Sequence, residues 1–233
     1  MILFCLPYAG GSGSIYFKWR SHLHHSIRLI PIELKGRGRR SDENLYKNVQ
    51  EAVNDIFENN REEIENNPYA IYGHSMGSIL AYELYYKVSN LNLRKPTHIF
   101  FSGYSAPNVT RVGEKLHTLS DSDFIDKVIG LGGTPQELMD NQELMQLVTP
   151  MIRSDFKMIE NYVYEKKANK IECNISILNG KQDTIALEKL LVWKDHTCKG
   201  FKMYHLEGDH FFLNHNMERI VSIINETIVE EST

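Results

Sequence analysis

The chain has 233 residues, of which 42% are apolar and 24% are charged, and its formal net charge at pH 7 is −4. This length suits one domain with a sizeable core. The slightly acidic balance gives no general reason to expect binding to nucleic acid or to a membrane surface, and no apolar run approaches the roughly 18 residues of a membrane span.

Six short apolar runs, each bounded by turn residues, are the predicted strands. They lack a simple alternation of polar and apolar residues, which is typical of strands buried on both faces. The runs are Ile2–Leu6, Ile27–Leu34, Tyr69–Tyr72, His98–Ser102, Cys173–Leu178 and Phe201–Leu206.

Segments with helical spacing lie between these runs. Because strands alternate with helices, we expect an α/β protein with a mostly parallel central sheet and helices on both faces. We interpret residues 1–233 as a single domain. The predicted helices are Tyr16–Leu23, Val49–Ile64, Ser78–Val88, Leu187–Trp193 and Ile220–Ile228.

The connection between the fourth and fifth strands, about residues 106–172, is far longer than one crossover helix requires. It contains three helix-start signals of its own, two caps and one threonine–proline pair. We therefore interpret it as a helical lid over the strand ends rather than a decorative insertion. The signals are Thr134-Pro135-x-Glu137, Asp140-x-x-Glu143 and Thr149-Pro150.

Residues 73–77, Gly-His-Ser-Met-Gly, form a G-x-S-x-G motif between a predicted strand and a predicted helix. The string alone is weak evidence. At a strand–turn–helix elbow, however, the serine takes a strained conformation that projects its hydroxyl, and the flanking glycines avoid collisions. We interpret Ser75 as a nucleophile rather than a turn residue. The same elbow directs the amide of Met76 at a bound carbonyl group.

A serine nucleophile needs a base and an acid that orients the base. After such an elbow, the acid and then the base follow on loops at the ends of later strands. His210 lies on the loop after the last strand and is the predicted base, and Asp183 follows the fifth strand and is the predicted acid. Asp209 is adjacent to His210, but neighbouring side chains usually diverge. The alternatives are a surface histidine and an aspartate that only stabilises its turn.

The second amide of an oxyanion hole is expected on the glycine-rich loop "PYAGGSGS" that follows the first strand. Its small residues let backbone amides approach a substrate closely. We assign Ala9 as this donor, with Tyr8 and Gly10 as near alternatives. Neither G-x-x-x-x-G-K-[ST] nor G-x-G-x-x-G is present, so the loop does not fit a phosphate-binding motif.

Four cations, Lys35, Arg37, Arg39 and Arg40, lie on the loop after the second strand. They indicate either a solvated loop or a docking patch for an acidic partner. The cluster His22-x-His24-His25 lies at a predicted helix end, where histidines are favourable, and we expect no metal there. The three cysteines are odd in number and widely spaced, which indicates a reduced cytoplasmic protein.

Six strings that span almost the whole chain agree in order and spacing with one family, and the chain resembles the type II thioesterases. These are the stand-alone editing hydrolases of non-ribosomal peptide and polyketide assembly lines. Lys35 departs from the proline that the family often has before its basic loop. The strings are "LFCLPYAGGSGSIYFKW", "GRGRR", "YGHSMGSILAYEL", "FSGYSAP", "LGGTPQELMDNQELMQLVTPMIRSDFKMIENY" and "LLVWKDHTCKGFKMYHLEGDHFF".

The resemblance implies an α/β-hydrolase fold with a helical lid and a triad of Ser75, Asp183 and His210. It also implies hydrolysis of acyl or aminoacyl thioesters from the phosphopantetheine arm of peptidyl or acyl carrier proteins. We expect no cofactor, because phosphopantetheine is part of the substrate, and we expect a monomer. The alternatives are a medium-chain fatty acyl thioesterase, a small-molecule carboxylesterase and a carrier-binding module without activity.

Overall fold

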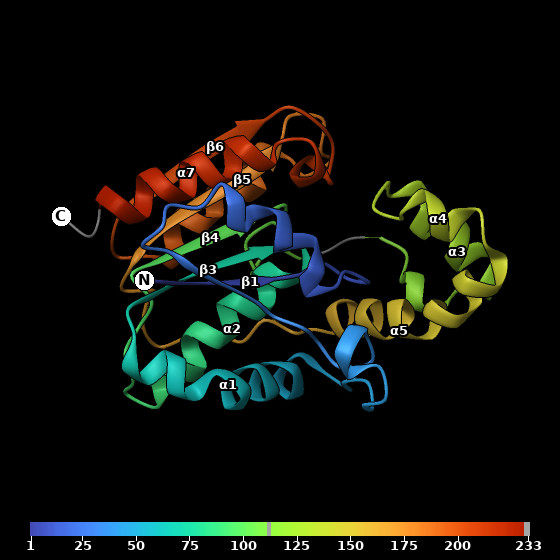
Figure 1. The fold of residues 1–233 in the computed structure, drawn as a ribbon, viewed down its shortest axis with the longest axis horizontal. Coiled ribbons are helices and arrows are strands. Elements are labelled where there is room, and N and C mark those ends of the chain that lie inside the picture. The colour runs from blue at the N-terminus through green and yellow to red at the C-terminus, as the bar shows by residue number, and fades with distance from the viewer. Residues whose placement is uncertain (111–112, 231–233) are drawn as a thin grey trace.

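The computed structural model describes residues 1–110 and 113–230, which are arranged around one six-stranded sheet (Figure 1). The strand order is β2-β1-β3-β4-β5-β6 and every neighbouring pair is parallel. The predicted parallel sheet is therefore confirmed. The strands are β1 (Ile2–Leu6), β2 (Arg28–Pro31), β3 (Tyr69–His74), β4 (His98–Ser102), β5 (Asn174–Gly180) and β6 (Phe201–Leu206).

Helices cover both faces of the sheet, each over its own apolar cluster. This is the layered arrangement predicted for an α/β-hydrolase. One face carries α1 (Val49–Asn66), α2 (Met76–Asn90), α6 (Leu187–Leu191) and the 3-10 helix η4 (Val192–His196). The other face carries the 3-10 helices η1 (Gly13–Ser21) and η5 (Phe212–Asn214) and the long helix α7 (Met217–Glu230).

Strand β1 shows why the strands lack polar alternation. Ile2, Phe4 and Leu6 belong to the cluster beneath α1 and α2, whereas Leu3 and Cys5 belong to the cluster beneath η1 and α7. All five residues are buried. Because successive side chains of a strand point to opposite faces, a strand between two helical layers needs apolar residues at every position.

Two predicted elements differ from the structure near the edge strand. The predicted helix Tyr16–Leu23 overlaps the 3-10 helix η1, which ends at Ser21. This helix begins after Ser12, whose side chain accepts from the amide of Ser14. The predicted strand Ile27–Leu34 is reduced to β2, which ends at Pro31. Proline has no N–H to donate, so it suits an edge strand.

The helices within residues 106–172, which we call the helical segment, lie beyond the carboxyl ends of the strands (Figure 1), whereas residues 167–172 run back along α2. As expected, the elements that the structure describes there are all helices. That the segment acts as a lid stays a prediction. Its elements are η3 (Leu116–Thr118), α3 (Asp121–Gly130), α4 (Gln136–Met139) and α5 (Gln142–Glu160).

The three predicted helix starts in this segment were wrong in detail. Pro135, not Thr134, occupies the N-cap of α4 and makes no side-chain cap. Asn141, not Asp140, caps α5. Pro150 lies inside α5 rather than at a helix start, because buried residues on both sides of it hold the helix against its neighbours.

No helix within residues 1–110 and 113–230 is both long and apolar enough to cross a bilayer. Among the same residues, no three histidine, cysteine, aspartate or glutamate side chains are grouped as metal ligands.

Candidate active site

Ser75 occupies a strained elbow between β3 and α2, as predicted. Its φ of 52° and ψ of −116° are rare for a residue with a side chain. The flanking glycines permit this turn: a Cβ on Gly73 would lie 2.2 Å from the carbonyl oxygen of Gly77, and a Cβ on Gly77 would lie 2.2 Å from that of Leu6. The glycines therefore let β3, α2 and the end of β1 approach one another around the serine.

His210 and Asp183 lie beside Ser75 in a continuous hydrogen-bonded chain. The Nε2 atom of His210 is 3.0 Å from the Oγ of Ser75, and its Nδ1 is 2.9 Å from an oxygen of Asp183. The three residues come from loops after β3, β5 and β6, whose carboxyl ends meet at one edge of the sheet. The side chain of Asp183 is 1% exposed and that of His210 is 25% exposed, so the carboxylate is buried while the imidazole remains accessible to solvent.

The two neighbouring carboxylates have different roles in the loops. The second oxygen of Asp183 accepts from the amide of Ile185, so this side chain also stabilises its own turn. Asp209 accepts from the amide of Phe211, two residues on. The carboxylate of Asp209 therefore stabilises its own loop, and Asp183 is the acid that contacts His210.

A hydrogen bond in the loop after β1 excludes one candidate for the second oxyanion donor. The amide of Gly10 donates to Asp155 at 2.8 Å, so Gly10 is not available as a donor to substrate. Tyr8 and Ala9 both line the same cavity as Ser75, so Tyr8 stays an alternative. Met76 opens α2, and amides in the first turn of a helix have no acceptor within the helix. Ala9 and Met76 remain the predicted pair.

His74 is a site residue that the motif did not reveal. Its ring is fully buried between the Ser75 elbow and the His210 loop, and its Nδ1 lies 2.8 Å from the hydroxyl of Ser102. Burial lowers the pKa of His74 well below its ordinary value, and the neighbouring His210 lowers it further. His74 is therefore neutral at physiological pH.

A cavity of about 700 Å³ opens over Ser75 and His210. Its walls come from the loops after β1, β5 and β6 and from the helical segment, so substrate would contact both parts of the chain. Its lining is partly apolar, with Leu116, Leu131, Phe156 and Ile159 contributed by the helical segment. A volume of this size is typical of small-molecule sites.

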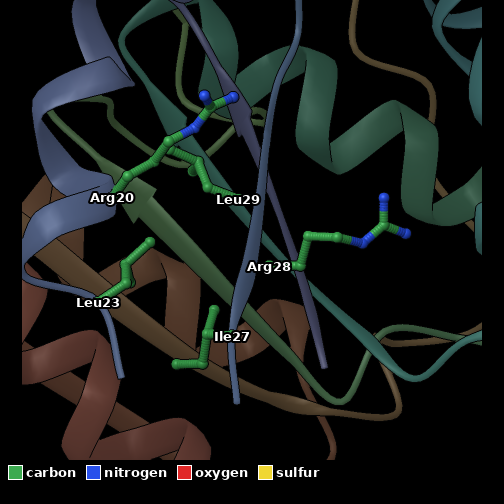
Figure 2. Close-up of a pocket in the computed structure, with 5 residues that line it drawn as sticks. All are labelled: Arg20, Leu23, Ile27, Arg28 and Leu29. Atoms are coloured by element: carbon green, nitrogen blue, oxygen red, sulfur yellow. The ribbon is translucent and has the colours of Figure 1, made fainter. Parts of the chain in front are cut away.

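A second hollow, of about 400 Å³, lies between η1 and β2 (Figure 2). It is lined by Arg20, Leu23, Ile27, Arg28 and Leu29, and the two guanidinium groups lie apart. Arg28 pairs with Glu63. None of the three predicted catalytic residues contributes to it, so it is separate from the site at Ser75.

The predicted docking patch needs a correction at Arg37. This side chain is 4% exposed and forms an ion pair with the equally buried Asp155, so it cannot contact a partner at the surface. The guanidinium group of Arg40 is bound within the chain, because it donates to both Glu43 and Asp55. These hydrogen bonds raise the pKa of Arg40.

Lys35 lies 3.5 Å from Asp55 and is partly buried, whereas Arg39 is exposed. Burial would raise the pKa of Asp55, but the hydrogen bonds from Arg40 and Tyr46 outweigh it and lower that pKa. Most of the basic loop is therefore neutralised within the chain, and docking by Lys35, Arg39 and Arg40 stays a prediction.

A sequence model of the thioesterase domain family matches residues 1–228. The chain is 35% identical over 232 residues to linear gramicidin dehydrogenase LgrE of Brevibacillus parabrevis, covering 98% of this chain and 88% of LgrE.

Solved structures show the same likeness in three dimensions. ClbQ, from the colibactin NRPS/PKS pathway, superposes with a TM-score of 0.95 at 36% identity, covering 99% of this chain and 98% of ClbQ. The type II thioesterase BorB, from the borrelidin biosynthetic cluster, superposes with a TM-score of 0.88 at 30% identity, covering 97% of this chain and 91% of BorB.

Proposed function

The chain belongs to the thioesterase family, and on this premise we propose that it removes acyl or aminoacyl groups from the phosphopantetheine arm of peptidyl or acyl carrier proteins. It is a serine hydrolase of the type II thioesterase kind, related to enzymes of non-ribosomal peptide and polyketide synthesis. Its role in such a pathway is to clear carriers that hold a wrong or stalled acyl group.

The observation that carries the proposal is the chain of contacts from Ser75 through His210 to the buried Asp183, at 3.0 Å and 2.9 Å. A nucleophile, a base and an orienting acid in this order are the requirements for acyl transfer to a serine. LgrE bears a dehydrogenase name, but these three groups suit acyl transfer rather than hydride transfer.

In the first half-reaction, the Oγ of Ser75 attacks the thioester carbonyl carbon while the Nε2 of His210 takes the hydroxyl proton. Asp183 holds the imidazole in the tautomer with its proton on Nδ1 and stabilises the cation that forms. Collapse of the tetrahedral intermediate breaks the carbon–sulfur bond, and the proton on Nε2 passes to the leaving sulfur. The carrier thiol departs and an acyl-serine remains.

In the second half-reaction, water attacks the acyl-serine and gives a proton to the Nε2 of His210. The second tetrahedral intermediate breaks its bond to Ser75, whose oxygen regains the proton, and the free acid leaves. The amides of Met76 and Ala9 hold the oxyanion in both halves. Loss of one such donor typically costs about 3 kcal/mol in the barrier.

The proposal includes the partners and the location. The substrate brings the phosphopantetheine arm, so the chemistry requires no cofactor of the enzyme. The enzyme acts as a monomer on carrier domains, and nucleic acid and membranes are not among its partners. We place it in the cytoplasm, since Cys5, Cys173 and Cys198 form no disulfide, as is usual in a reducing compartment.

The test is acyl release from an acetyl-phosphopantetheinyl carrier protein, followed by intact mass. Acetyl-CoA and a p-nitrophenyl ester serve as competing substrate types, and the Ser75→Ala variant is the blank. We expect a higher kcat/KM for the carrier-bound acetyl group than for either small substrate, and no release above background by Ser75→Ala.

Each alternative gives a different result in this assay. A small-molecule carboxylesterase would hydrolyse the p-nitrophenyl ester best. A medium-chain thioesterase would prefer an octanoyl or decanoyl carrier over the acetyl carrier. A carrier-binding module without activity would release nothing and would not be labelled at Ser75 by a fluorophosphonate. Near-normal thioester hydrolysis by Ser75→Ala would overturn the assignment of the nucleophile.

A further inference from the structure

A buried ion pair joins the helical segment to the loop that carries the predicted oxyanion donor Ala9. The Nη1 and Nη2 atoms of Arg37 donate to the two carboxylate oxygens of Asp155 at 2.7 and 2.8 Å. Arg37 lies on the loop after β2, and Asp155 lies on α5. Both side chains are only 4% exposed. Burying two charges is costly, so an arrangement of this kind needs further hydrogen bonds to complete it.

Those further bonds go to the backbone next to Ala9. The oxygen of Asp155 that accepts from Arg37 Nη1 also accepts from the amide of Gly10 at 2.8 Å. The same Nη1 donates to the carbonyl oxygen of Gly11 at 2.9 Å. The ion pair thus holds one N–H and one C=O of two consecutive residues in the loop after β1.

The held residues belong to a turn that fixes the orientation of Ala9. The amide of Gly11 donates to the carbonyl of Tyr8, which closes a four-residue turn with Ala9 and Gly10 in the middle. Gly10 has a φ of +79°, as the third residue of a type II turn requires. The peptide groups on both sides of Ala9 are therefore set by this turn.

Helix α5 also packs directly against the turn. A Cβ on Gly10 would lie 3.1 Å from the side chain of Ile152, one helical turn before Asp155. The loop and the helix approach so closely that the position of one constrains the other. A shift of α5 would move both Ile152 and the carboxylate that holds the Gly10 amide.

We propose that Arg37 and Asp155 are positioning residues, which fix the Ala9 turn in the geometry that binds the oxyanion and make that geometry depend on the placement of α5. Neither residue reaches the reacting atoms. The inference rests on the proposed function, because it assumes that an oxyanion forms at Ser75 beside Ala9.

Through the Ala9 turn, the pair affects the transition state, in which charge develops on the substrate oxygen, far more than the bound substrate. A misplaced donor weakens binding of the transition state and leaves ground-state binding almost unchanged, so kcat falls while KM stays nearly constant. A misplacement of about 1 Å can cost about 100-fold in rate. We therefore expect Arg37→Met and Asp155→Asn each to lower kcat about 10- to 100-fold, with KM changed by about threefold or less.

The assay uses an acetyl thioester of N-acetylcysteamine and the matching oxoester, neither of which contacts a carrier surface. The wild-type protein is measured first. If it hydrolyses neither ester and also fails with the carrier-bound acetyl group, the proposed function has failed, and the positioning role of Arg37 and Asp155 is overturned with it. If it hydrolyses any of the three, the variants are measured on that substrate.

A second measurement separates positioning from general structural damage. An alkyl trifluoromethyl ketone forms a tetrahedral adduct with a serine nucleophile, and its oxygen occupies the oxyanion site. Its inhibition constant should rise in the variants by about the same factor as kcat falls, because both depend on oxyanion binding. A variant that is only less stable would keep this constant unchanged.

The chain offers a matched control in the ion pair between Lys167 and Glu83. These side chains are 18% and 10% exposed, lie 2.8 Å apart, and join the helical segment to α2 without contacting the loop after β1. We expect Lys167→Met and Arg37→Met both to lower the thermal midpoint, because each leaves a buried carboxylate unpaired. Lys167→Met should nevertheless keep kcat and the inhibition constant within about twofold of wild type.

A conservative variant keeps the test decisive if Arg37→Met does not fold. Arg37→Lys retains the charge but loses the planar fork that reaches Asp155 and Gly11 together. It should fold, and its kcat should lie between those of wild type and Asp155→Asn. The proposal is overturned if folded Arg37→Lys and Asp155→Asn keep wild-type kcat and ketone affinity, or if Lys167→Met lowers both equally.

Discussion

The centroids of the His74 and His210 rings lie 5.4 Å apart, yet only His210 is placed to accept a proton from Ser75. His210 contacts Ser75 and Asp183, whereas His74 is fully buried and its pKa is well below the ordinary value. Two unit charges at this distance would repel by about 3 kcal/mol at an effective dielectric constant of about 20. A neutral His74 avoids that repulsion when His210 becomes a cation during the reaction.

We expect His74→Gln, which is uncharged at every pH, to leave the acidic limb of the pH profile of kcat/KM within about 0.3 pH unit of wild type. If His74 carried charge in the active range, its removal would shift that limb upward by about one unit or more, since a like charge disfavours protonation nearby. The measurement is thioester hydrolysis between pH 5 and 9. A large upward shift would show that His74 is charged.

The acid of the triad can be tested with two neighbouring aspartates. Asp183→Asn removes the charge that orients His210, so kcat should fall about 10³- to 10⁴-fold while the fold is retained. Asp209→Asn is the control: its side-chain oxygen can still accept from the amide of Phe211, and kcat should stay within about fivefold of wild type. Equal losses in the two variants would contradict the assignment of Asp183.

The triad could be predicted from sequence because each member follows a strand. Carboxyl ends of parallel strands meet at one edge, so the ends of β3, β5 and β6 bring Ser75, Asp183 and His210 together whatever the exact loop shapes. Short apolar runs bounded by turn residues also predicted most strands to within two residues. The elbow glycines were predictable for the same reason, since a tight turn between packed elements leaves no room for a Cβ.

Long-range pairing of charged residues could not be predicted in this way. Arg37 in the sequence looks like its exposed neighbour Arg39, and nothing local marks Asp155, 118 positions away, as its partner. Pro150 was misassigned as a helix start because local rules do not include the packing that carries α5 through it. Both errors arise where tertiary contacts override local signals.

The basic loop should contribute little to carrier docking. Since Arg37 is buried and Arg40 is bound to Glu43 and Asp55, Arg39 is its most exposed cation, and one exposed ion pair is worth about 0 to 1 kcal/mol. We expect Arg39→Ala to raise KM for a carrier-bound substrate about fivefold or less and to leave hydrolysis of an N-acetylcysteamine thioester unchanged. A loss of 50-fold or more would identify a docking hot spot.

The first residues of the helical segment are anchored by a buried histidine. His196 lies 2.7 Å from the side-chain oxygen of Asn108 and packs against Tyr82 and Trp193. Burial lowers its pKa to about 4. The unfolded chain, in which a histidine has a pKa of about 6.5, therefore binds more protons than the folded one between pH 6.5 and 4.

Because the unfolded chain binds more protons, the folded protein becomes less stable as the pH falls. The contribution of neutral His196 to stability is fully present above pH 6.5 and is lost as the pH falls towards 4. Allowing for partial solvent screening, we expect wild type to lose about 1 kcal/mol more unfolding free energy than His196→Gln between pH 7 and pH 5. Denaturant unfolding of both proteins at the two pH values measures this difference. Equal losses would show that His196 titrates normally in the folded protein, and a greater loss in His196→Gln would show that folding raises the pKa of His196.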